Sequence, residues 1–250
     1  MAKTEIPAGF YFRDSSHSYF YDGKRMTGTT TVLGIIAKPN LIPWAARVAV
    51  EFIQAAVQNG IPLTDEIFAD AKVAHTKKKE EAGVAGTDTH ALVEEWVKTC
   101  VAQKALVVST EDAKSPIFPF IQWAVANSIT FLASEKRVYS KEWFVAGTYD
   151  MKFEMNGLTY IADVKTQKAI YDRTPFAQMA AYQYMEGEMG EPKVDGRIII
   201  HMPRERVFNP DSDVYLSEHY EDDLKLFQAA LEIYRNLNNR FEPLSTYKNK

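Results

Sequence analysis

Residues 147–165 read GTYDMKFEMNGLTYIADVK, a pattern that predicts two antiparallel β-strands joined by a tight turn. Asn156 and Gly157 form a preferred two-residue hairpin turn, because both residues tolerate positive φ. When they make the turn, Met155 faces Leu158 and every directly opposed pair has positions that sum to 313. The turn therefore predicts the register of the whole hairpin.

Side-chain alternation gives this hairpin two different faces, because successive residues of a strand point to opposite sides. We expect one face to be core, and it consists of Tyr149, Met151, Phe153, Met155, Leu158, Tyr160, Ala162 and Val164. The other face is almost wholly polar, with Thr148, Asp150, Lys152 and Glu154 against Thr159, Ile161, Asp163 and Lys165. On this second face the register places Asp150 directly opposite Asp163.

Two facing aspartates call for an explanation, because like charges opposed across a strand pair destabilise it. Oxygen ligands on a rigid hairpin suit a hard divalent ion such as Mg²⁺ or Mn²⁺. Lys165 lies two residues beyond Asp163 on the same face, where an ammonium can orient a water or offset charge on a scissile phosphate. The alternative is a solvent-facing hairpin whose charges are simply hydrated.

Other candidate residues are weaker signals when taken alone. Glu135 on a preceding predicted strand, or Glu142 as its competitor, can add a carboxylate to the pair. His90 is expected in the first turn of a helix, where the helix dipole favours the neutral, metal-binding imidazole; a cap or a packed histidine is the alternative. Gln178 and Tyr182 are neighbours on one helix face and can present an amide and a hydroxyl to phosphate, or be structural.

Composition places the chain among ordinary soluble globular proteins. It has 250 residues, 46% of them hydrophobic and 25% charged, and the net charge of -4 disfavours a strongly basic nucleic-acid coat protein. The single Cys100 excludes an intramolecular disulfide, a cysteine zinc site and an iron–sulfur cluster. Because no apolar run reaches the ~18 residues of a membrane span, we expect a cytoplasmic protein without a membrane partner.

The remaining chain predicts an α/β (α+β) protein with a mixed central sheet flanked by helices. The expected helices cover 29–36, 43–58, 65–81, 87–103, 175–186 and 221–237. The expected strands cover 135–139, 146–155, 158–166 and 196–202, and a small hairpin turns at Asp22-Gly23. Common nucleotide-binding, protease and hydrolase signatures are missing from the sequence, which leaves metal-assisted hydrolysis.

Five short motifs occur in one order along the chain: Gly86-Thr87-x-x-His90, Glu135, Gly147-Thr148-x-Asp150, Asp163-Val164-Lys165 and Gln178-x-x-x-Tyr182. This pattern resembles the RecB-like branch of the PD-(D/E)XK nuclease superfamily. The stretch 27–46 is also similar to phage-encoded exonucleases of this branch and to the mitochondrial genome maintenance exonuclease. The resemblance implies one nuclease domain over 1–250. Its region 1–104 would be mostly helical with a small hairpin, and 105–250 would be a restriction-endonuclease-like catalytic core.

The resemblance also implies a role for each site residue. His90, Asp150, Asp163 and the Val164 carbonyl would ligate the metal, Lys165 would be the catalytic lysine, Glu135 would support the metal or DNA side, and Gln178 and Tyr182 would hold the substrate. The chain departs from the family in two respects. Asp163 replaces the commoner glutamate before the lysine, and the four cysteines of the cluster-bearing relatives are missing, so no iron–sulfur cluster is expected.

The implied activity is an Mg²⁺- or Mn²⁺-dependent DNA exonuclease that hydrolyses phosphodiester bonds at single-stranded or processed duplex ends. One or two ions are both compatible with the motif. The implied setting is phage-type recombination, replication or DNA degradation in a bacterial cytoplasm, with a single-strand annealing or replication protein as a possible partner. Tyr19, Tyr21 and Trp44 are candidates for base stacking. Alternatives are a structure-specific endonuclease and a non-catalytic DNA-binding module, and the oligomeric state stays open.

Overall fold

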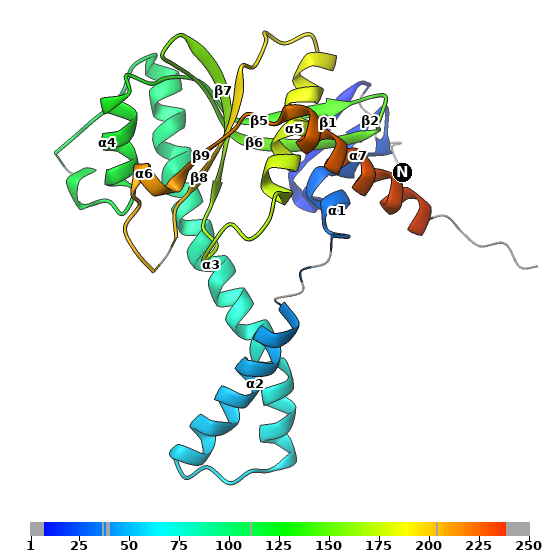
Figure 1. Cartoon of the computed structure of the whole chain (residues 1–250), viewed down its shortest axis with the longest axis vertical. Helices are drawn as coiled ribbons and strands as arrows, with labels where there is room; N and C mark the ends of the chain where they lie inside the picture. Colours follow the sequence, from blue (N-terminus) through cyan, green and yellow to red (C-terminus); the bar gives the residue numbers. More distant parts are fainter. Residues whose placement is uncertain (1–7, 37, 39–40, 111, 204, 239–250) are drawn as a thin grey trace, which may run out of the picture.

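The computed structural model describes residues 8–36, 38, 41–110, 112–203 and 205–238, and for 81–88 it describes the backbone alone. Its body is a six-stranded mixed β-sheet with helices on both faces, and two helices project from this body as an arm (Figure 1). The predicted mixed central sheet flanked by helices is therefore confirmed. In the described part of the chain, no helix is long and apolar enough to cross a bilayer.

The predicted hairpin is the centre of the sheet. Its strands are β6 (Val145–Met155) and β7 (Leu158–Lys165). Asn156 and Gly157 make the turn with φ angles of 53° and 75°, and five opposed pairs have positions that sum to 313. The predicted turn and register are confirmed over these pairs. The pairing of β6 with β7 ends one step before Asp150 and Asp163, so these two residues do not form a ladder pair.

The pairing ends there because two strands, β4 (Thr27–Gly28) and β7, share one edge of β6 and each pairs with only part of it. Antiparallel β5 (Thr130–Ser140) follows the other edge from Val145 to Glu154. On the shared edge, parallel β4 pairs with the start of β6 and β7 pairs with its end. On this shared edge, residues 147–150 lie between the two partners and have no described strand beside them. Asp150 is therefore in a gap of the sheet, where its side chain can reach across to β7.

The sheet continues from β7 to its other edge. Strand β8 (Gly196–His201) pairs with β7 in parallel, and β9 (Val214–Ser217) pairs with β8 antiparallel. A parallel neighbour requires a crossover connection, and α5 (Thr174–Glu188) supplies it. Two further short helical elements are η2 (Asp112–Lys114) and α6 (Pro210–Asp213).

Both faces of the sheet are buried under helices. One core packs α4 (Phe118–Ala126) and the end of α3 (Asp65–Gln103) against the sheet around Met151 and Phe153. The other core packs α1 (Thr29–Leu33), α5 and α7 (Tyr220–Leu237) against Ile161 and Ile199. The candidate site residues of β6 and β7 are thus held between two apolar layers, and their backbone is fixed from both sides.

The polar face of the hairpin is covered by α5, so the alternative of a solvent-facing hairpin is wrong. Lys152 is buried and forms an ion pair with the buried Glu186 of α5. Tyr149 was predicted to share the core face with Met151, but it joins the α5 side and donates a hydrogen bond to Glu186 over 2.7 Å. The alternation of β6 therefore breaks at Asp150, where the sheet has its gap.

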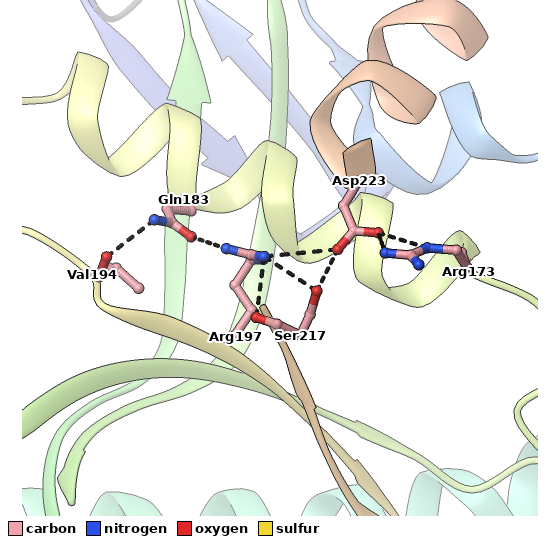
Figure 2. A network of polar contacts seen from close by, with 6 residues as sticks. All are labelled: Arg173, Gln183, Val194, Arg197, Ser217 and Asp223. Atoms are coloured by element: carbon pink, nitrogen blue, oxygen red, sulfur yellow. Dashed lines mark hydrogen bonds and ion pairs between the residues drawn. The ribbon is translucent and has the colours of Figure 1, made fainter. Parts of the chain in front are cut away.

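A polar network fastens α5 to its neighbours (Figure 2). Asp223 at the start of α7 is fully buried and accepts hydrogen bonds from Arg173 over 2.7 and 3.1 Å. Arg197 of β8 donates to Gln183 of α5 over 2.6 Å and to Ser217 of β9. Because Arg173 immediately precedes α5 and Gln183 lies in its middle, the network fixes the helix at two points.

Helix α3 is one continuous helix of 39 residues, so the prediction of separate helices at 65–81 and 87–103 is wrong. Its first half and α2 (Leu41–Gln58) form the projecting arm, whereas its last part packs on the sheet (Figure 1). A glycine costs a helix only about 1 kcal/mol relative to alanine, so Gly83 and Gly86 do not have to end it. His90 consequently lies in the middle of α3 and not in a first turn.

A small three-stranded sheet opens the chain. It consists of β1 (Phe10–Arg13), β2 (Ser18–Tyr21) and β3 (Lys24–Arg25), with η1 (Asp14–Ser16) between the first two strands. The turn predicted at Asp22 and Gly23 is confirmed, with φ angles of 47° and 75°. Strands β1, β4 and β9 and helix α4 were not predicted, because their short or wholly apolar segments lack a clear period.

Candidate active site

The centre of the predicted site is formed by Asp150, Asp163 and Lys165. Asp150 reaches across the gap beside β6, and its Oδ2 accepts a hydrogen bond of 2.6 Å from the backbone N–H of Val164. Asp163 is 4% exposed, and its Oδ2 forms an ion pair with Lys165 Nζ. The structure thus brings the three charged residues of the hairpin together, although Asp150 and Asp163 are not a ladder pair.

Helix α5 extends this cluster with a chain of polar contacts. Lys165 Nζ donates to Gln178 Oε1 over 3.3 Å, and Gln178 Nε2 donates to the Tyr182 hydroxyl over 2.8 Å. The spacing of four residues places Gln178 and Tyr182 on the same helix face, as expected. The amide and the phenol are buried under the helix, so both are held in defined positions beside Lys165.

Glu135 lies beside Asp150 in the sheet. It is between the β5 residues that pair with Tyr149 and Met151, and its φ of 49° is unusual for a residue other than glycine. Burial, followed by repulsion from Glu94, raises the pKa of Glu135 to about 7. The competitor Glu142 accepts a hydrogen bond from Tyr184 in the turn before β6. Glu135 is therefore the carboxylate that belongs with this site.

Helix α3 contributes His90 from the other side of the hairpin. His90 Nδ1 lies 3.5 Å from Asp150 Oδ2, and the imidazole is 38% exposed. Glu94 is one turn further along α3 and interacts electrostatically with Glu135, and it was not among the predicted site residues. Its four-residue spacing from His90 is the signal that could have identified it. Both residues lie within the helix predicted at 87–103, so this spacing was already visible in the sequence.

The cluster places the two carboxylates of Asp150 and Asp163 beside a single ammonium group, that of Lys165. Burial, and next the negative charge of Asp163, raise the pKa of Asp150 well above its ordinary value. Burial lowers the pKa of Lys165, but the attraction of Asp163 and Asp150 outweighs it, so the net shift is upward. Burial and the charge of Asp163 also raise the pKa of Tyr182, which keeps its hydroxyl protonated as a donor.

Asp150 and Asp163 offer carboxylate oxygens to the divalent cation that the sequence predicts. Asp163 Oδ2 is buried, its ion-pair partner is the Lys165 ammonium, and oxygen atoms are the ligands that Mg²⁺ and Mn²⁺ prefer. Among the residues whose side chains are described, no three His, Cys, Asp or Glu come close enough together to enclose an ion. Asp150 and Asp163 are thus the core of the donor set. Ligation by His90 and by the Val164 carbonyl stays a prediction.

Gly147 has a packing role that the sequence motif does not reveal. A Cβ atom at this position would lie 2.3 Å from Cε1 of Tyr182 and 2.8 Å from the Thr29 hydroxyl. Only glycine lets β6 approach α5 this closely. The neighbouring Thr148 shares a hydrogen bond of 2.9 Å with the Tyr19 hydroxyl. Gly86 and Thr87 belong to the stretch for which the structure describes only the backbone, so their part in the motif is untested.

The predicted stacking residues do not all face solvent. Tyr19 is buried beneath the N-terminal sheet, so its prediction as a base-stacking residue is wrong. Tyr21 is half-buried against Tyr139, and Trp44 packs edge-on against His75 of α3. Both rings therefore already contact other side chains of the protein.

A comparison with protein-family models finds no match, and a comparison with curated proteins finds none either. Function is therefore inferred from the motifs and geometry of this chain.

Proposed function

We propose that this protein is an Mg²⁺- or Mn²⁺-dependent deoxyribonuclease with a PD-(D/E)XK catalytic core, acting as an exonuclease on DNA ends. One observation carries the proposal. Two acidic residues and a lysine from one hairpin converge with an amide and a hydroxyl from α5, in a cluster that is partly exposed at His90 and Lys165. A solvated surface hairpin has no reason to bury Asp163 beside Asp150.

Each residue of the cluster has a separate role in the proposed hydrolysis of a phosphodiester bond. A cation held by Asp150 and Asp163 would supply the charge that polarises a phosphoryl oxygen and lowers the pKa of a water. Lys165, kept protonated by its neighbours, orients the attacking water or stabilises negative charge on the phosphate. Gln178 holds the lysine ammonium in place, and Tyr182 in turn holds the Gln178 amide.

Exonuclease action is the part of the proposal that rests on the similarity of residues 27–46 to phage-encoded exonucleases. The experiment compares end-labelled linear single-stranded DNA with covalently closed circular single strands, each with Mg²⁺, with Mn²⁺ and with EDTA. We expect metal-dependent loss of the linear strand alone. Cleavage of the circle would favour the endonuclease. If neither single strand nor duplex ends are cut, the binding-module alternative replaces the nuclease.

The variant Asp163→Ala tests the assignment of the site. We expect it to abolish cleavage while the protein stays folded, because it removes the buried carboxylate of the cluster. Asp222→Asn is the matched control, since Asp222 is an exposed carboxylate in the first turn of α7. Circular dichroism shows whether each variant is folded. Full activity of Asp163→Ala with Mg²⁺ present would refute the site.

A further inference from the structure

The N-terminal three-stranded sheet has two aromatic faces, and only one of them is needed for the fold. The inner face packs against the body, and it consists of Phe10, Phe12, Tyr19 and Tyr21 with Tyr139 of β5. On the outer face Tyr11 and Phe20 are directly opposed and stack with ring centroids 5.0 Å apart and an angle of 6°. Both rings are partly exposed, and neither belongs to a hydrophobic core.

Two arginines accompany these outer rings. The Arg13 guanidinium lies 4.5 Å from the centre of the Phe20 ring, and Arg25 is opposed to Phe20 on β3, so it points to the same face. Both arginines are exposed, and within the described residues neither forms an ion pair. Their acidic neighbours are already engaged. Asp14 lies 3.5 Å from Arg137, and the Asp22 carboxylate accepts a hydrogen bond from the backbone N–H of Gly9.

Flat aromatic rings flanked by guanidinium groups that form no described ion pair match the chemistry of a single nucleic-acid strand. Exposed bases stack on aromatic side chains, and arginines contact phosphates or stack on the bases themselves. A duplex does not fit the aromatic pair, because its bases are already stacked on each other. The net charge of the chain is -4, so this basic and aromatic face is a local feature and not an average property.

The face is rigidly connected to the strand that carries Asp150. Tyr19 on the inner side shares its hydrogen bond with Thr148, which is two residues before Asp150 in β6. Strand β4 follows β3 after one residue and pairs with the start of β6. Figure 1 shows the small sheet beside β5 and β6. A strand held on the outer face would therefore keep a fixed position relative to the candidate active site.

We propose that the outer face of the β1–β3 sheet is a platform for single-stranded DNA, on which bases stack against Tyr11 and Phe20 while Arg13 and Arg25 contact phosphates. The choice of DNA as the nucleic acid rests on the proposed function. The platform itself is a binding site distinct from the cluster of Asp150 and Asp163. It holds the strand by surfaces that take no part in cleavage.

Binding is measured without metal, so that cleavage plays no role. The probe is a fluorescein-labelled oligodeoxythymidine in EDTA, and fluorescence anisotropy gives its Kd with the whole protein. A second oligonucleotide carries 2-aminopurine, whose fluorescence is quenched when it stacks on an aromatic ring. The test variants are Tyr11→Ala, Arg13→Gln and Arg25→Gln. The controls are Tyr215→Ala and Lys193→Gln, which change an exposed tyrosine on β9 and a lysine whose side chain is 86% exposed.

We expect Tyr11→Ala to weaken binding about tenfold and to reduce the quenching, as removal of a base-stacking ring does. Arg13→Gln leaves the aromatic pair in place and serves if Tyr11→Ala fails to fold. We expect it to weaken binding and to reduce the slope of log Kd against log salt by about 0.7, the value for one phosphate contact to a single strand. The controls should bind as the wild type does.

Wild-type affinity in Arg13→Gln and Arg25→Gln, or no binding of the oligonucleotide by the wild-type protein, would overturn the platform. The outcome is separable from that of the proposed function. Variants that lose binding, in a protein that cuts no DNA with Mn²⁺, would support the platform and reject the nuclease. Cleavage by the wild type together with unchanged binding by all three variants would do the reverse.

Discussion

Asp163 and Lys165 are two positions apart on one strand, and residue identity alone reveals little of the cluster that they form with Asp150. Their spacing guarantees a shared face, but it says nothing about burial. The structure buries Asp163 to 4% exposure, next to an Asp150 whose pKa is raised by burial and by the same carboxylate. Two acids in this arrangement are stable together only when a proton, a lysine or a cation compensates their charge.

Replacement of Lys165 separates binding from chemistry. We expect Lys165→Ala to keep Mn²⁺ binding, because the two aspartates are unchanged, and to lower the single-turnover cleavage rate by about 10²-fold or more, as loss of a general catalyst does. Titration calorimetry with Mn²⁺ and single-turnover cleavage measure the two effects. An unchanged rate would refute the catalytic role of the lysine.

The carboxyl group of Glu135 makes stability depend on pH. Its pKa is about 7 in the folded protein against 4.5 for an unperturbed glutamate, so the folded state binds the proton more tightly. This contribution to stability is complete below pH 4.5 and is lost as the pH rises through 7. In EDTA, we expect Glu135→Gln to be more stable than the wild type at pH 8 and to lose this advantage at pH 5.

Urea unfolding at the two pH values measures this difference for Glu135→Gln. The exposed Glu66→Gln is a suitable control, since Glu66 lies in the arm and not near the sheet. A stability difference between Glu135→Gln and the wild type that is the same at pH 5 and pH 8 would show that the ionisation of Glu135 is not the cause.

At the scale of secondary-structure elements, helix α5 positions the polar groups of the candidate site that do not belong to the hairpin. Helix α5 brings Gln178 and Tyr182 to Lys165, and it is fixed by the network around Asp223 (Figure 2). A second set of contacts, from Lys152 and Tyr149 to Glu186, holds the helix on the other side. These buried charges are stable because each has a partner, and removal of one partner leaves the other desolvated and unpaired.

Two alanine variants of the network should differ strongly. Asp223→Ala leaves the guanidinium of Arg197, which is 2% exposed, without its carboxylate, and we expect a loss of about 3–5 kcal/mol in unfolding free energy. Arg173→Ala removes a half-exposed partner while Asp223 keeps Ser217 and Arg197, so we expect about 1 kcal/mol or less. Guanidinium unfolding measures both, and equal losses would contradict this account of the network.

At the level of elements, sequence periodicity predicted helices and strands reliably where exposed and buried side chains alternate regularly along the element. It was misleading at α3, which was divided at Gly83 and Gly86 although the helix continues through both. That error also moved His90 to a helix start. The helix dipole acts only within the first turn, so the predicted effect of the dipole on His90 does not apply in the middle of α3.

The whole molecule should respond to the cation that its site implies. Binding of Mn²⁺ to the folded state alone stabilises it, by about 2.7 kcal/mol at a free concentration of 100 times Kd. For a domain of this size that corresponds to a rise in Tm of about 5–10 °C. We expect this rise in the wild type and in Lys165→Ala, and its loss in Asp163→Ala. Thermal unfolding with Mn²⁺ and with EDTA measures it.

An equal rise in Tm for Asp163→Ala would show that Mn²⁺ binds elsewhere. A wild-type Tm that does not change with Mn²⁺ would contradict the proposed metal site directly. Asp222→Asn is again the control, because it removes one surface carboxylate and leaves the hairpin unchanged.

The local features of this protein follow from its amino-acid sequence: the turn at Asn156-Gly157, the register of the hairpin and the shared face of Asp163 and Lys165. These follow from backbone preferences and from side-chain alternation, which act between neighbours in the chain. Three other features arise from the packing of distant segments: α5 covers the polar face, β4 and β7 leave Asp150 in a gap, and Glu94 approaches Glu135. Such contacts join segments that are distant in the sequence. Their energies depend on packing, which cannot be predicted from the spacing of residues along the chain.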